Sequence, residues 1–123
     1  MDVNSLDQYI SKEIRKEVYV DHIKLFFPFY FDGTPVNFRF YRENNKFSVI
    51  STDGSFSEWM ANCTGDWKKA SPVIRSLAKI YGASWDNESG TLYLRFRRNE
   101  MSVAQAVIRL QQAVAVIGSL GPQ

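Results

Sequence analysis

The chain has one cysteine and one histidine among its 123 residues, and this scarcity excludes several kinds of chemistry. A single thiol, Cys63, cannot form a disulfide within the chain, which fits a reducing compartment. Cys63 and His22 together cannot supply the three or four soft ligands of a zinc site. We therefore expect no metal ion and no cofactor, and we interpret both residues as ordinary structural side chains.

The chain also lacks a strong excess of one charge and a long hydrophobic run. Its formal net charge is only +2, with an isoelectric point near 8.7, far from the balance of a dedicated nucleic-acid binder. The longest mostly apolar stretch, residues 103–120, is interrupted by polar residues and a glycine. The first residues do not have the basic and then apolar design of a signal peptide. We expect a soluble protein of the cytoplasm.

Motifs of the common enzyme classes are missing as well. Asp53-Gly54-Ser55 places a glycine turn before a predicted helix, but it lacks the second glycine and the lysine of a phosphate-binding loop. We interpret it as a strand-to-helix turn, with Gly54 at positive φ and Asp53 or Ser55 as the cap. No dinucleotide fingerprint or nucleophile elbow occurs. We expect that the protein is not an enzyme.

Aromatic residues, in contrast, are plentiful. Nine Phe, six Tyr and three Trp make up 15% of the chain, which is more than one core of this size needs. Length and an ordinary share of apolar residues fit a single domain over residues 1–123. Some of the aromatic surface is therefore expected to face a partner.

The spacing of apolar residues predicts an α+β fold. Its order is a helix, a three-stranded antiparallel meander, one or two helices, a two-stranded hairpin and a C-terminal helix. Ser71-Pro72 is read as the start of the helix before the second hairpin, and Gly82 as its end. In chain order the predicted elements occupy residues 2–16, 22–31, 36–42, 47–51, 55–61, 72–81, 83–85, 92–97 and 103–117.

Alternation along the two predicted hairpins directs one set of side chains to the outside. We call it the arginine–tyrosine set: Arg39, Tyr41, Tyr93, Arg95 and Arg97. If both hairpins share one sheet, the set forms a basic, aromatic surface able to stack bases and contact phosphates. The alternative is an ordinary solvated face, whose arginine head groups pair with Glu43, Glu88 or Glu100.

The predicted terminal helix has more apolar residues than one buried face requires. Two further aromatic residues flank Pro28 on what we expect to be an edge strand. These residues form the candidate surfaces of a two-fold dimer: Phe26, Tyr30, Ile108, Ala115 and Val116. The alternative is that the predicted first helix of the same chain packs against the additional apolar residues of the terminal helix.

The segment Phe47-Ser48-Val49-Ile50-Ser51-Thr52-Asp53-Gly54-Ser55, followed later by Ile80-Tyr81-Gly82-Ala83, resembles a family of small phage and bacterial domains of unknown function. Members carry a strand ending in a Thr/Ser-Asp-Asp-Gly-like signature, whereas this chain has a single aspartate. The resemblance spans residues 24–118, implies a prophage or mobile-element context and transfers no catalytic residue. The order of elements is also similar to that of type III secretion chaperones, which bind extended segments of other proteins and are commonly acidic.

The missing catalytic set and the surplus of aromatic residues favour a non-enzymatic protein-binding module, acting as an accessory or host-interaction factor of a prophage. A nucleic-acid-binding domain that uses the arginine–tyrosine set is the alternative, and a secretion-chaperone-like protein is the third.

Overall fold

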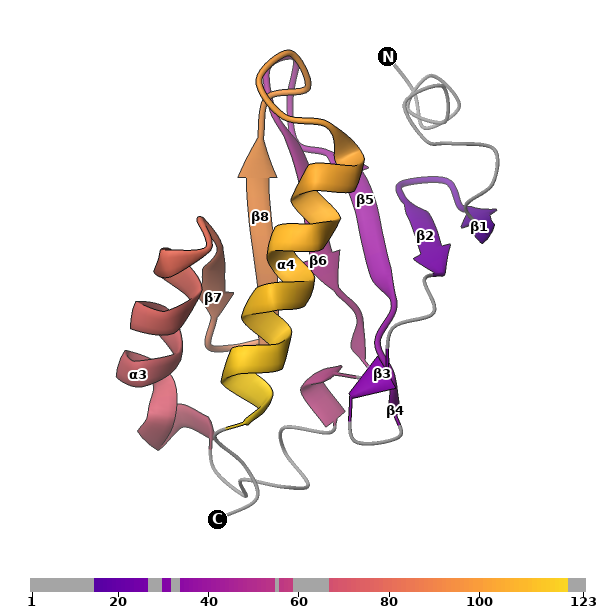
Figure 1. Ribbon diagram of the computed structural model, residues 1–123. Helices are drawn as coiled ribbons and strands as arrows, with labels where there is room; N and C mark the ends of the chain where they lie inside the picture. The colour runs from indigo at the N-terminus through magenta and orange to yellow at the C-terminus, as the bar shows by residue number, and fades with distance from the viewer. Residues whose placement is uncertain (1–14, 27–29, 32–33, 55, 59–66, 120–123) are drawn as a thin grey trace.

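The computed structural model describes residues 15–26, 30–31, 34–54, 56–58 and 67–119. Six strands form one antiparallel sheet in the order β1-β2-β5-β6-β8-β7, and two helices lie across one face of it (Figure 1). The six are β1 (Arg15–Val18), β2 (Ile23–Phe26), β5 (Phe38–Arg42), β6 (Ser48–Thr52), β7 (Ser84–Asp86) and β8 (Thr91–Phe96). A separate pair is β3 (Tyr30–Phe31) with β4 (Thr34–Pro35), and the helices are α3 (Trp67–Ile80) and α4 (Val103–Gly118). The predicted α+β class is confirmed.

The predicted meander is formed by β2, β5 and β6. The apolar inward residues of these strands are buried, and in the register Phe40 lies opposite Ile23 on one side and Ile50 on the other. The predicted second hairpin, β7 with β8, joins the same sheet because β8 pairs with β6, with Leu94 opposite Ile50. Both hairpins therefore share one sheet.

The core lies between this face of the sheet and α4, which packs over β6 and β8. One apolar stripe of α4 is buried along its whole length, together with Ala113: Val103, Ala106, Val107, Leu110, Val114 and Ile117. A capping box begins the helix, because the Ser102 hydroxyl accepts from the Gln105 N–H and the Gln105 side chain accepts from the Ser102 N–H. Local sequence signals thus place α4 correctly.

The N-terminal part of the sheet differs from the predicted helix at its start. Arg15 and Lys16, predicted to end a helix, belong to β1, which pairs antiparallel with β2 and sets Arg15 opposite Phe26. The edge of β2 offers a ladder of backbone hydrogen bonds, and this distant partner outweighs the local helical spacing. β2 is therefore an interior strand, and the prediction that Phe26 lies on an edge strand is wrong. Residues 2–14 and Pro28 lie outside the described residues.

α3 begins earlier than predicted. It starts at Trp67, so Pro72 is an interior residue and costs the helix one backbone hydrogen bond. Two lysines and an alanine in the first turn are good helix formers and offset part of this cost. The Ser71 hydroxyl donates to the side chain of Asn87 in the β7–β8 turn. The predicted end holds, since Gly82 has φ 76° and the Ala83 N–H reaches back to the Ala78 carbonyl at 2.9 Å.

Among the described glycines, positive φ occurs at Gly82 and Gly90. The prediction of a positive φ at Gly54 is therefore wrong, because Gly54 already belongs to the short helical turn that follows β6 and includes residues 56–58. Neither α3 nor α4 is long and apolar enough to cross a membrane.

Candidate functional site

The second face of the sheet holds the candidate site, because α3 and α4 both pack on the first. One row of side chains crosses this second face from strand to strand. Its members are Glu17, Lys24, Arg39, Ser51, Tyr93 and Ser84, each opposite the next in the register. In this row two large side chains, Arg39 and Tyr93, stand on either side of the small Ser51.

A hollow of about 660 Å³ opens at this point of the face. Adjacent strands lie about 4.8 Å apart, so Arg39 and Tyr93 rise about 10 Å from one another with the serine as the floor between them. We call this feature the sheet hollow. Its described lining residues are Asp21, His22, Arg39, Tyr41, Arg42, Ser51, Thr52, Asp86, Ser89, Thr91 and Tyr93.

The structure divides the arginine–tyrosine set into two groups. Arg39, Tyr41 and Tyr93 come together as walls of the sheet hollow. Arg95 and Arg97 lie on the same face, but their guanidinium groups stand over the ring of Phe47, with central carbons 3.8 and 4.9 Å from its centre. The set is therefore not one continuous surface.

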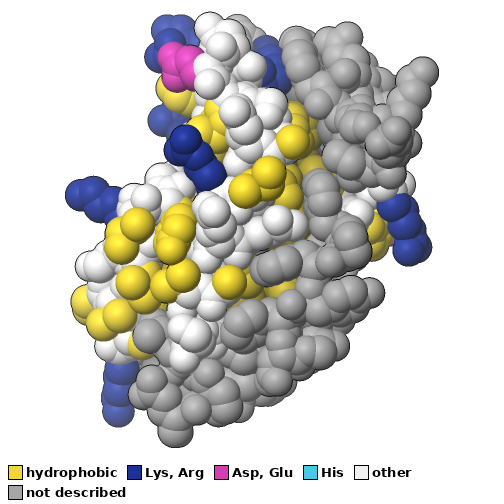
Figure 2. All heavy atoms as spheres, viewed as in Figure 1, with side chains coloured by type: hydrophobic (Ala, Val, Ile, Leu, Met, Phe, Trp, Pro, Cys, Tyr) yellow, Lys and Arg dark blue, Asp and Glu magenta, His cyan; other side chains and the backbone are white. Residues whose placement is uncertain are grey.

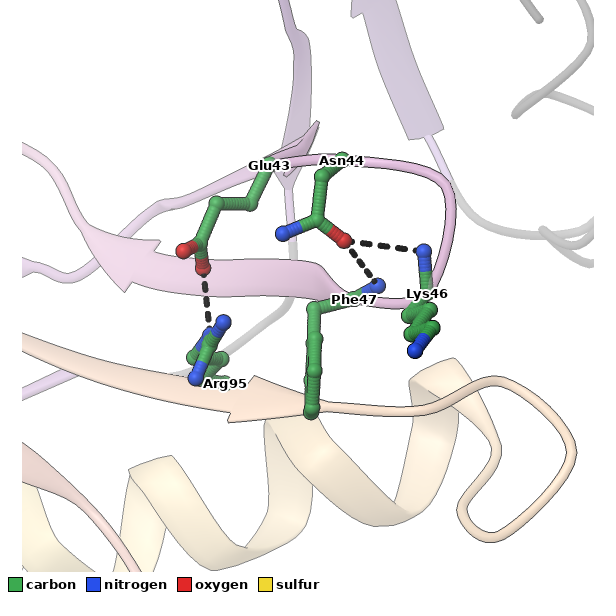
Figure 3. A network of polar contacts seen from close by, with 5 residues as sticks. All are labelled: Glu43, Asn44, Lys46, Phe47 and Arg95. Carbon is green, nitrogen blue, oxygen red and sulfur yellow. Dashed lines mark hydrogen bonds and ion pairs between the residues drawn. The ribbon is translucent and has the colours of Figure 1, made fainter.

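Arg95 is engaged within the protein. Its Nε donates to Glu43 Oε2 at 2.6 Å, so the predicted pairing of an arginine head group with Glu43 is present (Figure 3). The sequence analysis did not place Phe47 on this surface. Side chains two residues apart in a strand point to the same face, so Phe47 lies on the same side as Val49, and this alternation could have identified it. Two guanidinium groups stand over the Phe47 ring, and the part of the ring that they cover cannot stack on a base.

Both signs of charge are present in the sheet hollow. Hydrogen bonding from the His22 ring, at 2.7 Å, lowers the pKa of Asp21. The backbone N–H of Glu88, at 3.0 Å, and the Ser89 side chain lower the pKa of Asp86. Both carboxylates are therefore ionised at neutral pH. They face a hollow that is also lined by the side chain of Arg39.

Tyr41 contributes a phenol that keeps its proton. Burial raises its pKa above the ordinary value of 10.0, and the nearby carboxylate of Glu43 raises it further. Beside it, His22 is stacked on the Tyr19 ring with centroids 4.8 Å apart. The site thus offers hydrogen-bond donors, flat rings and both charges.

The candidate dimer residues fall on opposite layers. Ile108 is 53% exposed and Ala115 is exposed on the outer side of α4, with Val116 half-buried. Phe26 is half-buried on the sheet face, where the Arg15 guanidinium lies 4.7 Å from its ring centre. The Tyr30 side chain lies outside the described part. These residues therefore form two separate surfaces.

The outer side of the helix layer carries further apolar side chains that sequence reasoning did not mark as exposed. Val73 and Ile80 of α3 are 51% and 71% exposed. Hydrophobic side chains gather over α3 and part of α4 on this side of the molecule (Figure 2). The apolar surface is thus wider than the terminal helix alone.

Within the described residues, no group of three or more His, Cys, Asp or Glu side chains is arranged to hold a metal ion, and Cys63 lies outside them. Comparison of the chain with protein families, curated proteins and solved structures found no match. The resemblance to small phage domains therefore stays a prediction.

Proposed function

We propose that the chain is a non-enzymatic protein-binding module that docks a partner on the sheet hollow. The observation that carries this proposal is that Arg39, Tyr41 and Tyr93 together line one hollow on the sheet face opposite α3 and α4. Tyrosine and arginine dominate binding energy at protein interfaces, because they bury a large area and direct hydrogen bonds at a small loss of conformational freedom.

The mixed charge of the sheet hollow favours a protein over a nucleic acid. Asp21 and Asp86 repel phosphates, and Arg95 outside the hollow is already paired with Glu43. A protein segment offers both a carboxylate for Arg39 and N–H donors or cations for the two aspartates. Complementary charge of this kind also rejects partners of uniform charge.

The test is quantitative capture from a host lysate with Arg39→Ala and Tyr93→Ala, against Arg75→Ala on the exposed side of α3 as the matched control. Circular dichroism first establishes that all variants fold. We expect one protein to be enriched by the wild type and the control, and its affinity to fall by about thirtyfold or more in each hollow variant, the size of a hot-spot loss. Equal recovery by all variants, or none above background, would contradict the proposal.

Nucleic-acid binding is the second candidate function, and one observation favours it. Cations stand over aromatic rings at two places on the second face of the sheet, Arg15 and Lys24 over Phe26, and Arg95 and Arg97 over Phe47. Proteins that bind single strands combine such cations with stacking rings. Retardation of an oligonucleotide at low salt that disappears steeply with added salt is the expected result for this candidate. If micromolar protein retards neither single nor double strands, the candidate is eliminated.

The compartment and context of this function rest on the sequence. A single cysteine carries the proposal of a cytoplasmic location. The resemblance of residues 47–55 carries the proposal of a prophage or mobile-element accessory factor. A chaperone-like role in secretion is supported only by the order of helices and strands, and a fold alone does not determine function.

We also propose a two-fold dimer through the outer side of α4, where Ile108 and Ala115 are exposed together. Light scattering is expected to give a mass that rises with concentration toward twice 14.2 kDa, and Ile108→Glu to lower it. A constant 14.2 kDa up to about 100 μM would exclude a dimer of micromolar affinity.

A further inference from the structure

A second hollow, of about 480 Å³, lies where the β5–β6 hairpin loop approaches the segment between β8 and α4. Its described lining residues are Asn45, Lys46, Arg97, Arg98 and Asn99. Three of these side chains are cations, two are amides and none is a carboxylate. We call this feature the hairpin pocket, and it is distinct from the sheet hollow because the two share no described lining residue.

The groups around the hairpin pocket are held in place by contacts within the protein. Arg98 Nη1 donates to the hydroxyl of the fully buried Ser48 at 2.6 Å, and Arg97 lies over the Phe47 ring. Arg42 donates through its Nη2 to Asn45 Oδ1 at 2.5 Å. Since the side-chain oxygen of Asn45 accepts from Arg42, the other end of its amide is an N–H donor.

The hairpin loop is also fixed by its own hydrogen bonds. Asn44 Oδ1 accepts from the backbone N–H groups of Lys46 at 2.8 Å and Phe47 at 3.0 Å (Figure 3). This arrangement sets the position from which the Lys46 side chain leaves the loop. Cations from two segments about 50 residues apart are therefore brought to one pocket by the fold and not by a run of basic sequence.

We propose that the hairpin pocket binds the phosphate group of a small phosphorylated molecule. The like charges of Lys46 and Arg97 repel one another across this hollow, and an anion of two charges relieves that repulsion. Guanidinium groups match a phosphate through paired N–H donors, and an ammonium adds a compact charge. The nearby carboxylate of Glu43 is engaged by Arg95 and does not line the pocket. A volume of about 480 Å³ exceeds a bare phosphate and falls within the range of small-molecule sites.

The first arm of the test is calorimetric titration and thermal unfolding of the full chain with inorganic phosphate and with adenosine monophosphate. Adenosine and sodium chloride at matched ionic strength are the reference ligands. We expect saturable heat and a rise in Tm with both phosphate compounds and neither effect with the references, because a ligand that binds the folded state stabilises it as its concentration exceeds Kd. Equal effects of adenosine or chloride would overturn the proposal.

The second arm uses Lys46→Gln combined with Arg97→Gln, both at exposed positions, and Arg75→Gln on α3 as the matched control. Affinity for phosphate is expected to fall at least about tenfold in the double variant and to stay unchanged in the control. Phosphate also stabilises proteins by exclusion from their surface, an effect that the double variant retains. An equal rise in Tm in wild type and double variant would therefore refute a specific site.

If the double variant does not fold, Lys46→Gln alone is tested, and a smaller loss of phosphate affinity is expected.

A single-stranded oligonucleotide tests the other source of phosphate, which is the backbone of a nucleic acid. If adenosine monophosphate fails to compete while a single strand binds through Lys46 and Arg97, the pocket follows a nucleic-acid backbone and the small-molecule proposal is wrong.

Discussion

Ser51 shapes the sheet hollow because its small side chain lies between Arg39 and Tyr93 in the same row. The serine is only 7% exposed, yet it points away from the helix layer, so a larger side chain here would enter the hollow and not the core. Ser51→Phe is expected to keep the fold, since aromatic residues suit strands, and to block partner binding. Urea unfolding and partner affinity measured on the same variant separate the two effects; loss of both together would argue for a structural role.

Two glycines make a matched pair for a test of backbone strain. Gly82 has φ +76°, where a side chain is strained, whereas a Cβ at Gly54 meets no atom within 4 Å and the residue lies in a helical turn. Gly82→Ala is expected to destabilise the fold by about 1 kcal/mol, and Gly54→Ala to leave it unchanged or stabilise it by about 0.5 kcal/mol. Chemical denaturation checks both. A larger loss at Gly54 than at Gly82 would be inconsistent with this backbone geometry.

Because the pKa of Tyr41 is raised, the stability of the folded protein is expected to fall at alkaline pH. In the unfolded chain the phenol ionises near 10.0, while in the folded protein burial holds the proton to higher pH. The stability that this group contributes is present below 10.0 and is lost as the pH rises through the higher folded pKa. Titration at 295 nm should show a component above pH 10 that Tyr41→Phe removes. A Tyr41 component at or below pH 10 would count against the burial.

Among the elements, those with complete local signals were predicted well. α4 has a capping box and an apolar stripe, and the two hairpins have alternating residues around polar turns, so each is specified by its own segment. β1 and the start of α3 were missed. β1 exists through pairing with β2, and α3 extends past Pro72 toward its N-terminus, so neither boundary is determined by the residues beside it alone.

The candidate site was predictable to a similar degree. Alternation alone found Arg39, Tyr41 and Tyr93, because outward phase is a local property of a strand. The hollow between them depends on register, which sets Ser51 opposite both neighbours, and the sequence does not show that register. The hairpin pocket depends on the approach of two loops that are distant in the chain, so no local pattern predicts it.

The contribution of a single helix to stability can be tested at the capping box of α4. Ser102→Ala removes the acceptor of the Gln105 N–H bond at 3.1 Å and is expected to destabilise the protein by about 1 kcal/mol. Ser76→Ala is the control, because this hydroxyl bonds only the Pro72 carbonyl in its own helix at 3.0 Å and should cost less than about 0.5 kcal/mol. Thermal unfolding of both variants measures the difference. Equal losses would mean that the cap does not stabilise α4.

For the whole molecule, the decisive property is the difference between the two faces of the sheet. One face is buried under α3 and α4, while the other carries tyrosines, arginines and carboxylates around a hollow. Antiparallel sheets commonly leave one face to solvent, so openness alone is no evidence of function. The concentration of interface-type residues around one hollow is what supports binding.

A photo-crosslinking side chain introduced in turn at two positions tests this central claim most directly. Thr91 lines the sheet hollow, and Ser76 is exposed on α3 on the other side of the molecule. Irradiation in a host lysate is expected to join one partner protein to the chain from position 91 and not from position 76. Crosslinking from position 76 alone, or the absence of any specific product from position 91 in a folded protein, would contradict the claim.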